Sequence, residues 1–136
     1  MELLKERIRR EGKVLPGNII KVDGFLNHRV DTKLLEALAD EFAKYFDISK
    51  ITMVLTAEAS GIALATICAQ KYGVPMLFAK KAKSDNIEGG LYQSEIFSYT
   101  YKKKVTLLVS KEWLHPGDRV LVIDDFLARG EALRGL

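Results

Sequence analysis

Three short runs of apolar residues constrain the fold of this chain more than any other feature. Residues 51–55 and 74–81 flank a stretch of helical periodicity, 62–72, and residues 120–125 form a third run that ends in two acids. Continuous apolar runs of this length are typical of strands that are buried on both faces of a sheet. A strand, a helix and a second strand make one crossover unit, for which a right-handed path is expected. The sequence therefore predicts an α/β fold with a mainly parallel sheet flanked by helices.

Two further helices are predicted before this unit. Apolar residues recur at helical spacing over residues 3–10, and Gly12 would close that helix. A second amphipathic stretch covers residues 33–46, where Asp31 and Thr32 are both suitable N-caps. Both helices present one apolar side, so we expect each of them to pack against the core.

The remaining segments predict strands. Residues 18–31 alternate weakly and indicate a short strand followed by a loop. Residues 91–110 are typical of a β-hairpin whose turn lies around residues 102–104. No repeat, low-complexity tract or long linker interrupts the chain, so we expect a single domain over residues 1–136.

The composition excludes several classes of protein. With 136 residues, of which 48% are hydrophobic and 29% charged, the chain suits an ordinary globular domain. The net charge of +3 comes from scattered basic residues, which gives no basis for a nucleic-acid partner. Cys68 is the single cysteine, so the chain has neither an intramolecular disulfide nor a CxxC motif. Because no signal-like or membrane-spanning stretch is present, we expect a cytoplasmic protein without a membrane partner.

The third apolar run leads into the strongest candidate site. Asp124 and Asp125 follow residues 120–123 directly, at the carboxyl end of a predicted parallel strand, where ligands of open α/β sheets bind. Two acids at this place can accept hydrogen bonds from a ribose diol or from magnesium-bound water. Gly130 permits a tight turn with positive φ, and a helix starting near Glu131 would aim free N–H groups at an anion. The pattern therefore predicts a sugar-phosphate site.

A plainer interpretation of this segment is that Asp124 caps a loop and that Asp125 is solvated. We consider it the weaker one, because an idle acid at the end of a buried strand is costly. Other phosphate-binding motifs are absent, since the sequence contains neither GxxxxGK[ST] nor GxGxxG.

The segment VLVIDDFLARGEA resembles the 5-phosphoribosyl-1-diphosphate (PRPP) signature of the type I phosphoribosyltransferases. The rest of the chain is most similar to the bacterial xanthine branch of that family, and the motif DGFLNH narrows the resemblance to this branch. The matching segments occur in family order and span nearly the whole chain: residues 21–31, 58–63, 74–84 and 124–136.

The resemblance implies an architecture. It divides the single domain into a hood or base-binding segment over residues 1–32 and a core over residues 33–136. Within the core, the hairpin 91–110 would be a lid that closes over the substrates and keeps water away from the reacting carbon. Members of the family continue well past the PRPP motif, so the resemblance also implies that the C-terminal part of the domain is missing here.

The resemblance also implies a reaction in purine salvage. A nitrogen of xanthine would displace pyrophosphate from C1 of PRPP with the help of Mg²⁺, giving XMP and pyrophosphate. Asp124 and Asp125 would hold the ribose hydroxyls, directly or through magnesium-bound water, so that no residue ligates the metal directly. Asn27, with Ile20 beside it, would contact the base, and the enzyme would be a homodimer. The PRPP-binding residues carried over are Ala128, Arg129, Gly130, Glu131, Ala132, Glu58, Ala59, Ser60, Gly61, Lys80 and Lys81.

Alternatives stay open at several of these positions. From its residue type alone, Asn27 would more often support its own loop, and Lys80 and Lys81 fit a solvated basic loop equally well. The phosphate loop departs from the xanthine branch at Arg129 and Glu131; arginine suits a phosphate, and Glu131 would have to point its side chain outward. Hypoxanthine or guanine is the alternative substrate. A non-catalytic PRPP-binding regulator on the same fold is the alternative from another class.

Overall fold

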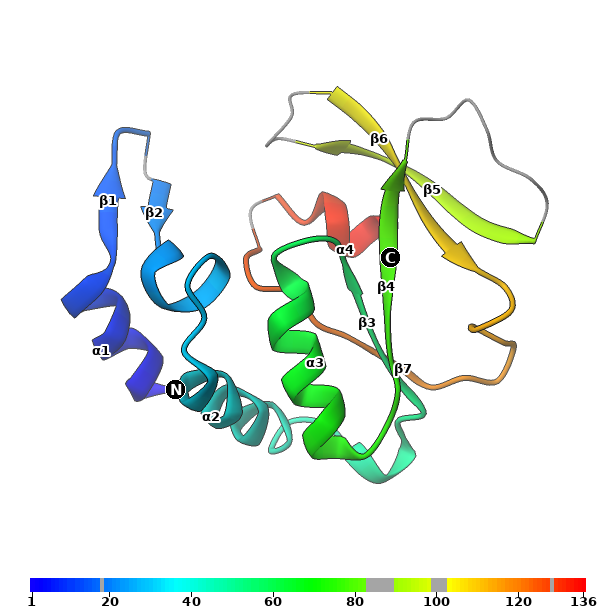
Figure 1. The fold of residues 1–136 in the computed structure, drawn as a ribbon, viewed down its shortest axis with the longest axis horizontal. Helices are drawn as coiled ribbons and strands as arrows, with labels where there is room; N and C mark the ends of the chain where they lie inside the picture. The colour runs from blue at the N-terminus through cyan, green and yellow to red at the C-terminus, as the bar shows by residue number, and fades with distance from the viewer. Residues whose placement is uncertain (18, 83–89, 99–102, 128) are drawn as a thin grey trace.

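The chain forms an α/β fold, seen in a computed structural model that describes residues 1–17, 19–82, 90–98, 103–127 and 129–136. A short π-helical turn, Asp23–Asn27, lies in the N-terminal part, and a 3-10 turn, Ile48–Lys50, lies before the sheet. The remaining elements are α1 Glu2–Glu11, β1 Lys13–Leu15, β2 Ile19–Lys21, α2 Thr32–Phe42, β3 Met53–Ala57, α3 Gly61–Tyr72, β4 Met76–Ala82, β5 Leu91–Ser98, β6 Lys103–Ser110, β7 Val120–Val122 and α4 Glu131–Gly135 (Figure 1).

The central sheet has five strands in the order β5-β6-β4-β3-β7. β3 is parallel to both of its neighbours, with Leu55 opposite Leu77 of β4 and Val122 of β7. β6 is antiparallel to β4 and to β5. The expected unit of strand, helix and strand is therefore confirmed as β3–α3–β4, and the expected hairpin as β5–β6.

Strand β4 belongs to two different ladders. Residues 76–79 pair in parallel with β3, whereas residues 80–82 pair antiparallel with residues 106–108 of β6. Hydrogen bonds in the same strand thus connect the hairpin to the parallel core, and Figure 1 shows β4 running from one part of the sheet into the other. The part of the hairpin that pairs with β4 is consequently a continuation of the central sheet.

The core lies on both faces of β3, whose five residues are all buried. Val54 packs with the apolar sides of α2 and α3 and with Leu121 of the neighbouring strand β7. Leu55 and Ala57 point to the opposite face, where they pack with Ile96 and other residues of the hairpin and with the partly buried Ala132 of α4. Adjacent strand residues face opposite sides of a sheet, so a continuous apolar run is what two covered faces require.

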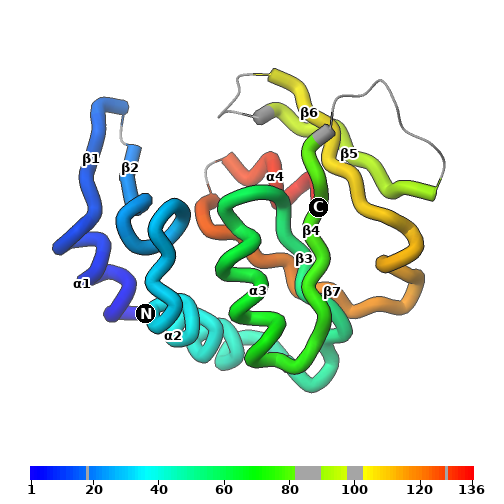
Figure 2. Tube along the Cα trace, in the orientation of Figure 1, coloured from blue at the N-terminus to red at the C-terminus, as the bar shows by residue number. Residues whose placement is uncertain are grey.

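The N-terminal segment lies to one side of the sheet, far from the β5–β6 hairpin (Figure 2). α1 rests on the core through the partly buried Leu4 and Ile8. The small hairpin of β1 and β2 is exposed at every described residue, and Val14 is 77% exposed. In the described part of the chain, no helix reaches the length and apolar character needed to span a membrane.

Three expectations about element boundaries were wrong. α2 ends at Phe42 rather than at residue 46, because Tyr45 and Phe46 are exposed and no packing favours further turns. β7 ends at Val122, before the acids, although Ile123 N still donates to Leu55 O at 2.9 Å. The β1 strand had not been expected.

Two loop expectations also need correction. Residues 23–27 form a helical turn rather than a loop, and this turn buries the neighbours Phe25 and Leu26 together. An extended strand would point one of the two outward. Lys103 and Lys104 belong to β6, opposite Ser98 and Phe97, rather than to the hairpin turn. Residue 102 lies outside the described residues.

Candidate active site

Asp124 and Asp125 lie directly beyond the carboxyl end of β7, as the sequence predicts. Asp124 is half-buried, and its Oδ1 accepts a hydrogen bond from Asp125 N at 3.0 Å. Burial raises the pKa of Asp124 to about 6. The hydrogen bond from the backbone N–H of Asp125 lowers this pKa, and the side-chain carboxyl of Asp125 raises it. Water therefore reaches this carboxyl poorly, and a ligand that donates hydrogen bonds to it would find a weakly solvated acceptor.

Gly61 at the start of α3 is what allows Asp124 to come this close. A Cβ atom at Gly61 would collide with Thr56 Oγ1 and would lie 2.9 Å from Asp124 Oδ1. Thr56 is fully buried, and its hydroxyl has no hydrogen-bond partner among the described residues. The absence of a side chain at position 61 thus has a steric cause, because the backbone there approaches an acid of the protein itself.

Asp125 connects three segments that are distant in the sequence. Its Oδ1 accepts from Ser60 Oγ at 2.8 Å, and its Oδ2 accepts from Asn27 Nδ2 at 2.9 Å. Asn27 comes from the helical turn before α2, and Ser60 from the loop between β3 and α3. The Asp125 carboxylate is therefore not solvated on all sides, whereas the Asp124 carboxylate does accept a hydrogen bond within its own loop.

The loop after β3 is fastened to β4. Glu58 N donates to Ala79 O at 3.0 Å, and the Glu58 side chain accepts a hydrogen bond from Lys81 N. The peptide bond between Glu58 and Ala59 is cis. These bonds place the loop beside the end of β4, with Ser60 facing Asp125.

The turn before α4 has the conformation that the sequence predicts for it. Gly130 has φ 76°, in the left-handed region, and α4 begins at Glu131. Arg134 N donates to Gly130 O at 2.9 Å. Of the predicted phosphate loop, Ala128 lies outside the described residues.

A cavity of about 160 Å³, called the acid cavity below, lies between the loop after β3, the two acids and the turn at Gly130. Of the predicted site, Ala59, Gly61, Lys80, Ile20 and Asn27 do not line it; Asn27 reaches it through Asp125, whereas Ile20 is exposed on β2. The predicted residues that line it are Glu58, Ser60, Lys81, Asp124, Asp125, Arg129, Gly130, Glu131 and Ala132. A larger cavity of about 450 Å³ lies between the hairpin and residues 114–118 and contains none of the predicted residues.

Sequence reasoning missed several residues of the site. Ile96 and Phe97 of β5 line the cavity from the hairpin side, and Leu127 and Leu133 line it from the segment around Gly130. The hydroxyl of Thr56 directly after an apolar run was a usable signal. The expected lid over residues 91–110 includes Ile96 and Phe97, but nothing in the sequence singled out these two, because their position depends on how the hairpin pairs with β4.

The cavity is more acidic than a phosphate site should be by itself. Its lining includes the acids Glu58, Asp124, Asp125 and Glu131 and the bases Lys81 and Arg129. Among the described residues, no group of three or more His, Cys, Asp or Glu side chains is placed to hold a metal ion alone. A divalent cation would fit here only if the ligand supplied part of its coordination, as Mg²⁺ commonly requires.

The chain was compared with known proteins, and no family model matches it. It is 54% identical over its whole length to the xanthine phosphoribosyltransferase of Lachnoclostridium phytofermentans and covers 70% of that protein. It is 52% identical over its whole length to the xanthine phosphoribosyltransferase of Lactobacillus delbrueckii subsp. bulgaricus and covers 72% of it.

Solved structures share the fold. The APRTase of Giardia lamblia complexed with 9-deazaadenine matches with TM-score 0.74 and 27% identity, over 94% of this chain and 71% of that chain. The adenine phosphoribosyltransferase of Saccharomyces cerevisiae matches with TM-score 0.74 over 99% of this chain and 78% of that chain, at 17% identity. The expected fold class is therefore confirmed.

Proposed function

The chain belongs to the xanthine phosphoribosyltransferase family, and we propose that it transfers the 5-phosphoribosyl group of PRPP to xanthine, giving XMP and pyrophosphate. The observation that carries the proposal is the position of Asp125, whose carboxylate is bonded to both Asn27 and Ser60. In this geometry a segment suited to bind a base meets an acid suited to bind a ribose. Hypoxanthine and guanine remain the alternative bases that a test has to include.

The two acids would bind and orient the ribose of PRPP. Asp124 and Asp125 are acceptors at the end of β7, and sugar hydroxyls are donors that match them. In the reaction a purine nitrogen forms a bond to C1 while the bond from C1 to the pyrophosphate oxygen breaks. Catalysis then depends on holding the two reactants in line and on stabilising the charge of the leaving group.

The phosphate groups of PRPP would lie on either side of the ribose. We assign the 5-phosphate to residues 129–132, where the turn at Gly130 opens α4 and Arg129 supplies a positive charge. We assign the pyrophosphate to residues 58–61 and to Lys81, which faces the cavity from β4. Ala128 and Lys80 belong to the same proposal on the resemblance alone.

The balance of charge favours Mg²⁺ as the cofactor. Four acids against two bases in the cavity lining would repel a substrate that carries a 5-phosphate and a diphosphate, unless a cation came with it. When bound, Mg²⁺ would supply positive charge to the pyrophosphate as it leaves. Asp124 and Asp125 would hold the ion by accepting hydrogen bonds from its water ligands.

Asn27 would contact the base. Its side-chain amide both donates and accepts hydrogen bonds, which suits the oxidised ring of xanthine. Ile20 is 39% exposed on β2, so its contact with a base would require the small β1–β2 hairpin to approach the site. The hood over residues 1–32, the lid over residues 91–110 and the homodimer are parts of the same proposal.

Calorimetry and turnover test the proposed function separately. We expect PRPP to bind in the presence of Mg²⁺ and to bind much more weakly after its removal with a chelator. We expect turnover with xanthine to exceed turnover with hypoxanthine and guanine in parallel assays. Binding of PRPP without turnover of any of the three bases would favour a regulator, and absence of PRPP binding would refute the site.

A further inference from the structure

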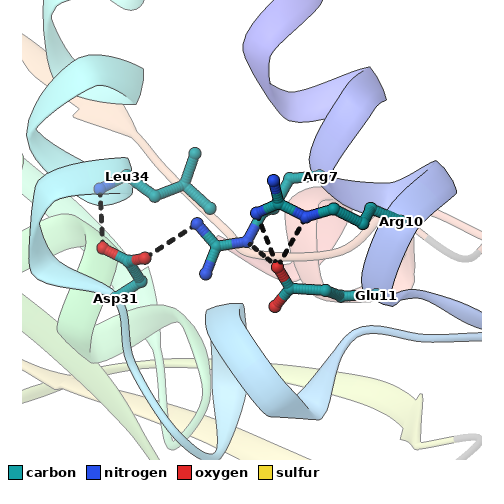
Figure 3. Close-up of polar contacts among 5 residues, drawn as sticks. All are labelled: Arg7, Arg10, Glu11, Asp31 and Leu34. Atoms are coloured by element: carbon teal, nitrogen blue, oxygen red, sulfur yellow. Dashed lines mark hydrogen bonds and ion pairs between the residues drawn. The ribbon is translucent and has the colours of Figure 1, made fainter.

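Arg7 of α1 connects the N-terminal helix to the segment that carries Asn27 (Figure 3). Its Nη1 lies 2.9 Å from Asp31 Oδ2, and its Nε lies 2.8 Å from Glu11 Oε1. Its guanidinium carbon lies 5.4 Å from the centre of the Phe25 ring. The Arg7 side chain is only 22% exposed, so removing one partner of these contacts would leave a charge uncompensated in a partly desolvated place.

The two contacts of Arg7 hold the two ends of one short segment. Phe25 is fully buried in the helical turn, and Asp31 N donates to Phe25 O at 3.0 Å. Asp31 Oδ1 accepts from Leu34 N at 3.1 Å and so caps α2. That hydrogen bond, together with the one from Arg7, lowers the pKa of Asp31 and keeps its carboxylate ionised. Asn27 lies between these two anchored residues.

Asn27 in turn contacts the lining of the acid cavity, because its amide nitrogen donates a hydrogen bond to Asp125 Oδ2. The path from Arg7 to the site therefore runs through one segment of nine residues, 23–31, without passing through the sheet. Removing Arg7 would leave Asp31 and Glu11 without this partner and would free the face of Phe25. The backbone of the segment would keep its own hydrogen bonds, and it would lose its contact with α1.

We propose that Arg7 is a positioning residue that sets the place of Asn27 and thereby the affinity for the purine base. The inference rests on the proposed function for the identity of that base. It assigns to α1 a role in substrate selection, although no residue of α1 lines the acid cavity. The affinity for PRPP depends mainly on other segments, so Arg7 should affect it less than the affinity for the base.

The test compares Arg7→Met with Arg7→Lys and with a matched control, Arg9→Met. Arg9 lies on the same helix and is ion-paired with Glu2 at 3.1 Å, but its side chain is 70% exposed. We expect Arg7→Met to raise the KM for xanthine roughly tenfold, since small misplacements of a binding group have large effects, and to change the KM for PRPP much less. Arg7→Lys should lie between, because lysine keeps a charge without the planar fork. Arg9→Met should match the unmodified protein.

A second readout does not depend on activity. In the ligand-free, nitrogen-labelled protein, the side-chain amide signals of Asn27 report its bond to Asp125, and Asn27→Ala identifies them by their loss. We expect these signals to shift in Arg7→Met and to stay in place in Arg9→Met. This measurement decides the positioning role even if the unmodified protein turns over no xanthine, an outcome that would refute the proposed function alone.

Two results would overturn the inference. One is an Arg7→Met variant whose Asn27 signals and KM for xanthine both equal those of the unmodified protein. The other is an equal rise in the KM values for xanthine and PRPP, because that would mean a general loosening of the fold. If Arg7→Met does not fold, Arg7→Lys decides by the same two criteria.

Discussion

Asn27 Nδ2 lies 2.9 Å from Asp125 Oδ2, although 98 residues separate the two along the chain. The contact joins the segment proposed to bind the base to the acid proposed to bind the ribose. In the ligand-free protein the Asn27 amide thus donates to the acid that a ribose hydroxyl would otherwise reach, and the Asp125 carboxylate accepts from the amide that a base would otherwise contact. A ribose hydroxyl that binds Asp125 would compete with the Asn27 amide and release it toward the base.

The two donors to Asp125 should therefore affect different substrates. We expect Asn27→Ala to lower kcat/KM for xanthine roughly ten- to a hundredfold, the range for leaving a polar group of the base without its hydrogen bond, and to change PRPP affinity less. Ser60→Ala should instead lower the affinity for PRPP. Initial-rate kinetics with each substrate varied in turn, together with PRPP calorimetry, check this. Identical effects of the two variants would contradict the division of roles.

Gly61→Ala should damage the site by steric collision. The new methyl group would meet Thr56 Oγ1 and Asp124 Oδ1, and both are held by the surrounding structure. We expect a loss of about 1–3 kcal/mol in the free energy of unfolding, with lower PRPP affinity. Gly24→Ala is the matched control, because a Cβ there meets nothing within 4 Å. Denaturant unfolding of both variants measures the difference, and equal stability would contradict this account of Gly61.

The raised pKa of Asp124 predicts a pH-dependent effect of its removal. Between its ordinary value of 3.8 and about 6, the folded protein binds the Asp124 proton more tightly than the unfolded chain does. Ionised Asp124 therefore lowers stability progressively as pH rises through this window, and above pH 6 the penalty is complete. Asp124→Asn lacks it, so its stability relative to the unmodified protein should rise between pH 4 and pH 7.

We expect this relative gain to be about 1 kcal/mol, since partial exposure of the carboxyl screens the effect. Urea unfolding of both proteins, without ligand and at several pH values, provides the measurement. Groups that do not interact with Asp124 titrate alike in both proteins and cancel in the difference. A stability difference that is constant with pH would show that Asp124 titrates normally.

Lys81 and Lys80 are neighbours on β4 with different surroundings. Lys81 lines the acid cavity, and Lys80 is exposed outside it. If one chain provides the whole PRPP site, Lys81→Ala should raise the KM for PRPP roughly tenfold or more, the effect of losing one charge-assisted contact, and Lys80→Ala should have a smaller effect. Steady-state kinetics at fixed xanthine decide the question. A larger effect of Lys80→Ala would place its side chain in the site of a second subunit.

The sequence predicted the parts of this fold that depend on local pattern. The apolar run over residues 51–55 and the helical period after it led directly to β3 and α3. The acids at the end of the third run and the turn at Gly130 also lie where their residue types require. In each case the physical cause acts within a few residues, because burial of a strand and a positive φ are local demands.

The contacts between distant segments could not be predicted in this way. Nothing local to Asn27 indicates that its partner is Asp125, since that depends on how α2 and the turn before it pack against the sheet. Lys103 and Lys104 suggested a solvated turn by their charge, yet hydrogen bonding to β5 includes them in a strand. Arg7 was one of several basic residues in α1, and only the fold distinguishes it from Arg9.

The division of β4 between two ladders makes local stability differ along the hairpin. Residues 106–108 of β6 have a strand on either side, whereas residues 103–105 pair with residues 96–98 alone among the described residues. A ribbon of two strands is marginally stable in water, so this distal part should open at a smaller free energy than its base and exchange its amide hydrogens sooner. Phe97, which lines the cavity and is 41% exposed, lies in this weaker part, whereas the buried Ile96 packs against the core. We therefore expect the end of the hairpin that pairs with β4 to stay closed while its distal end opens.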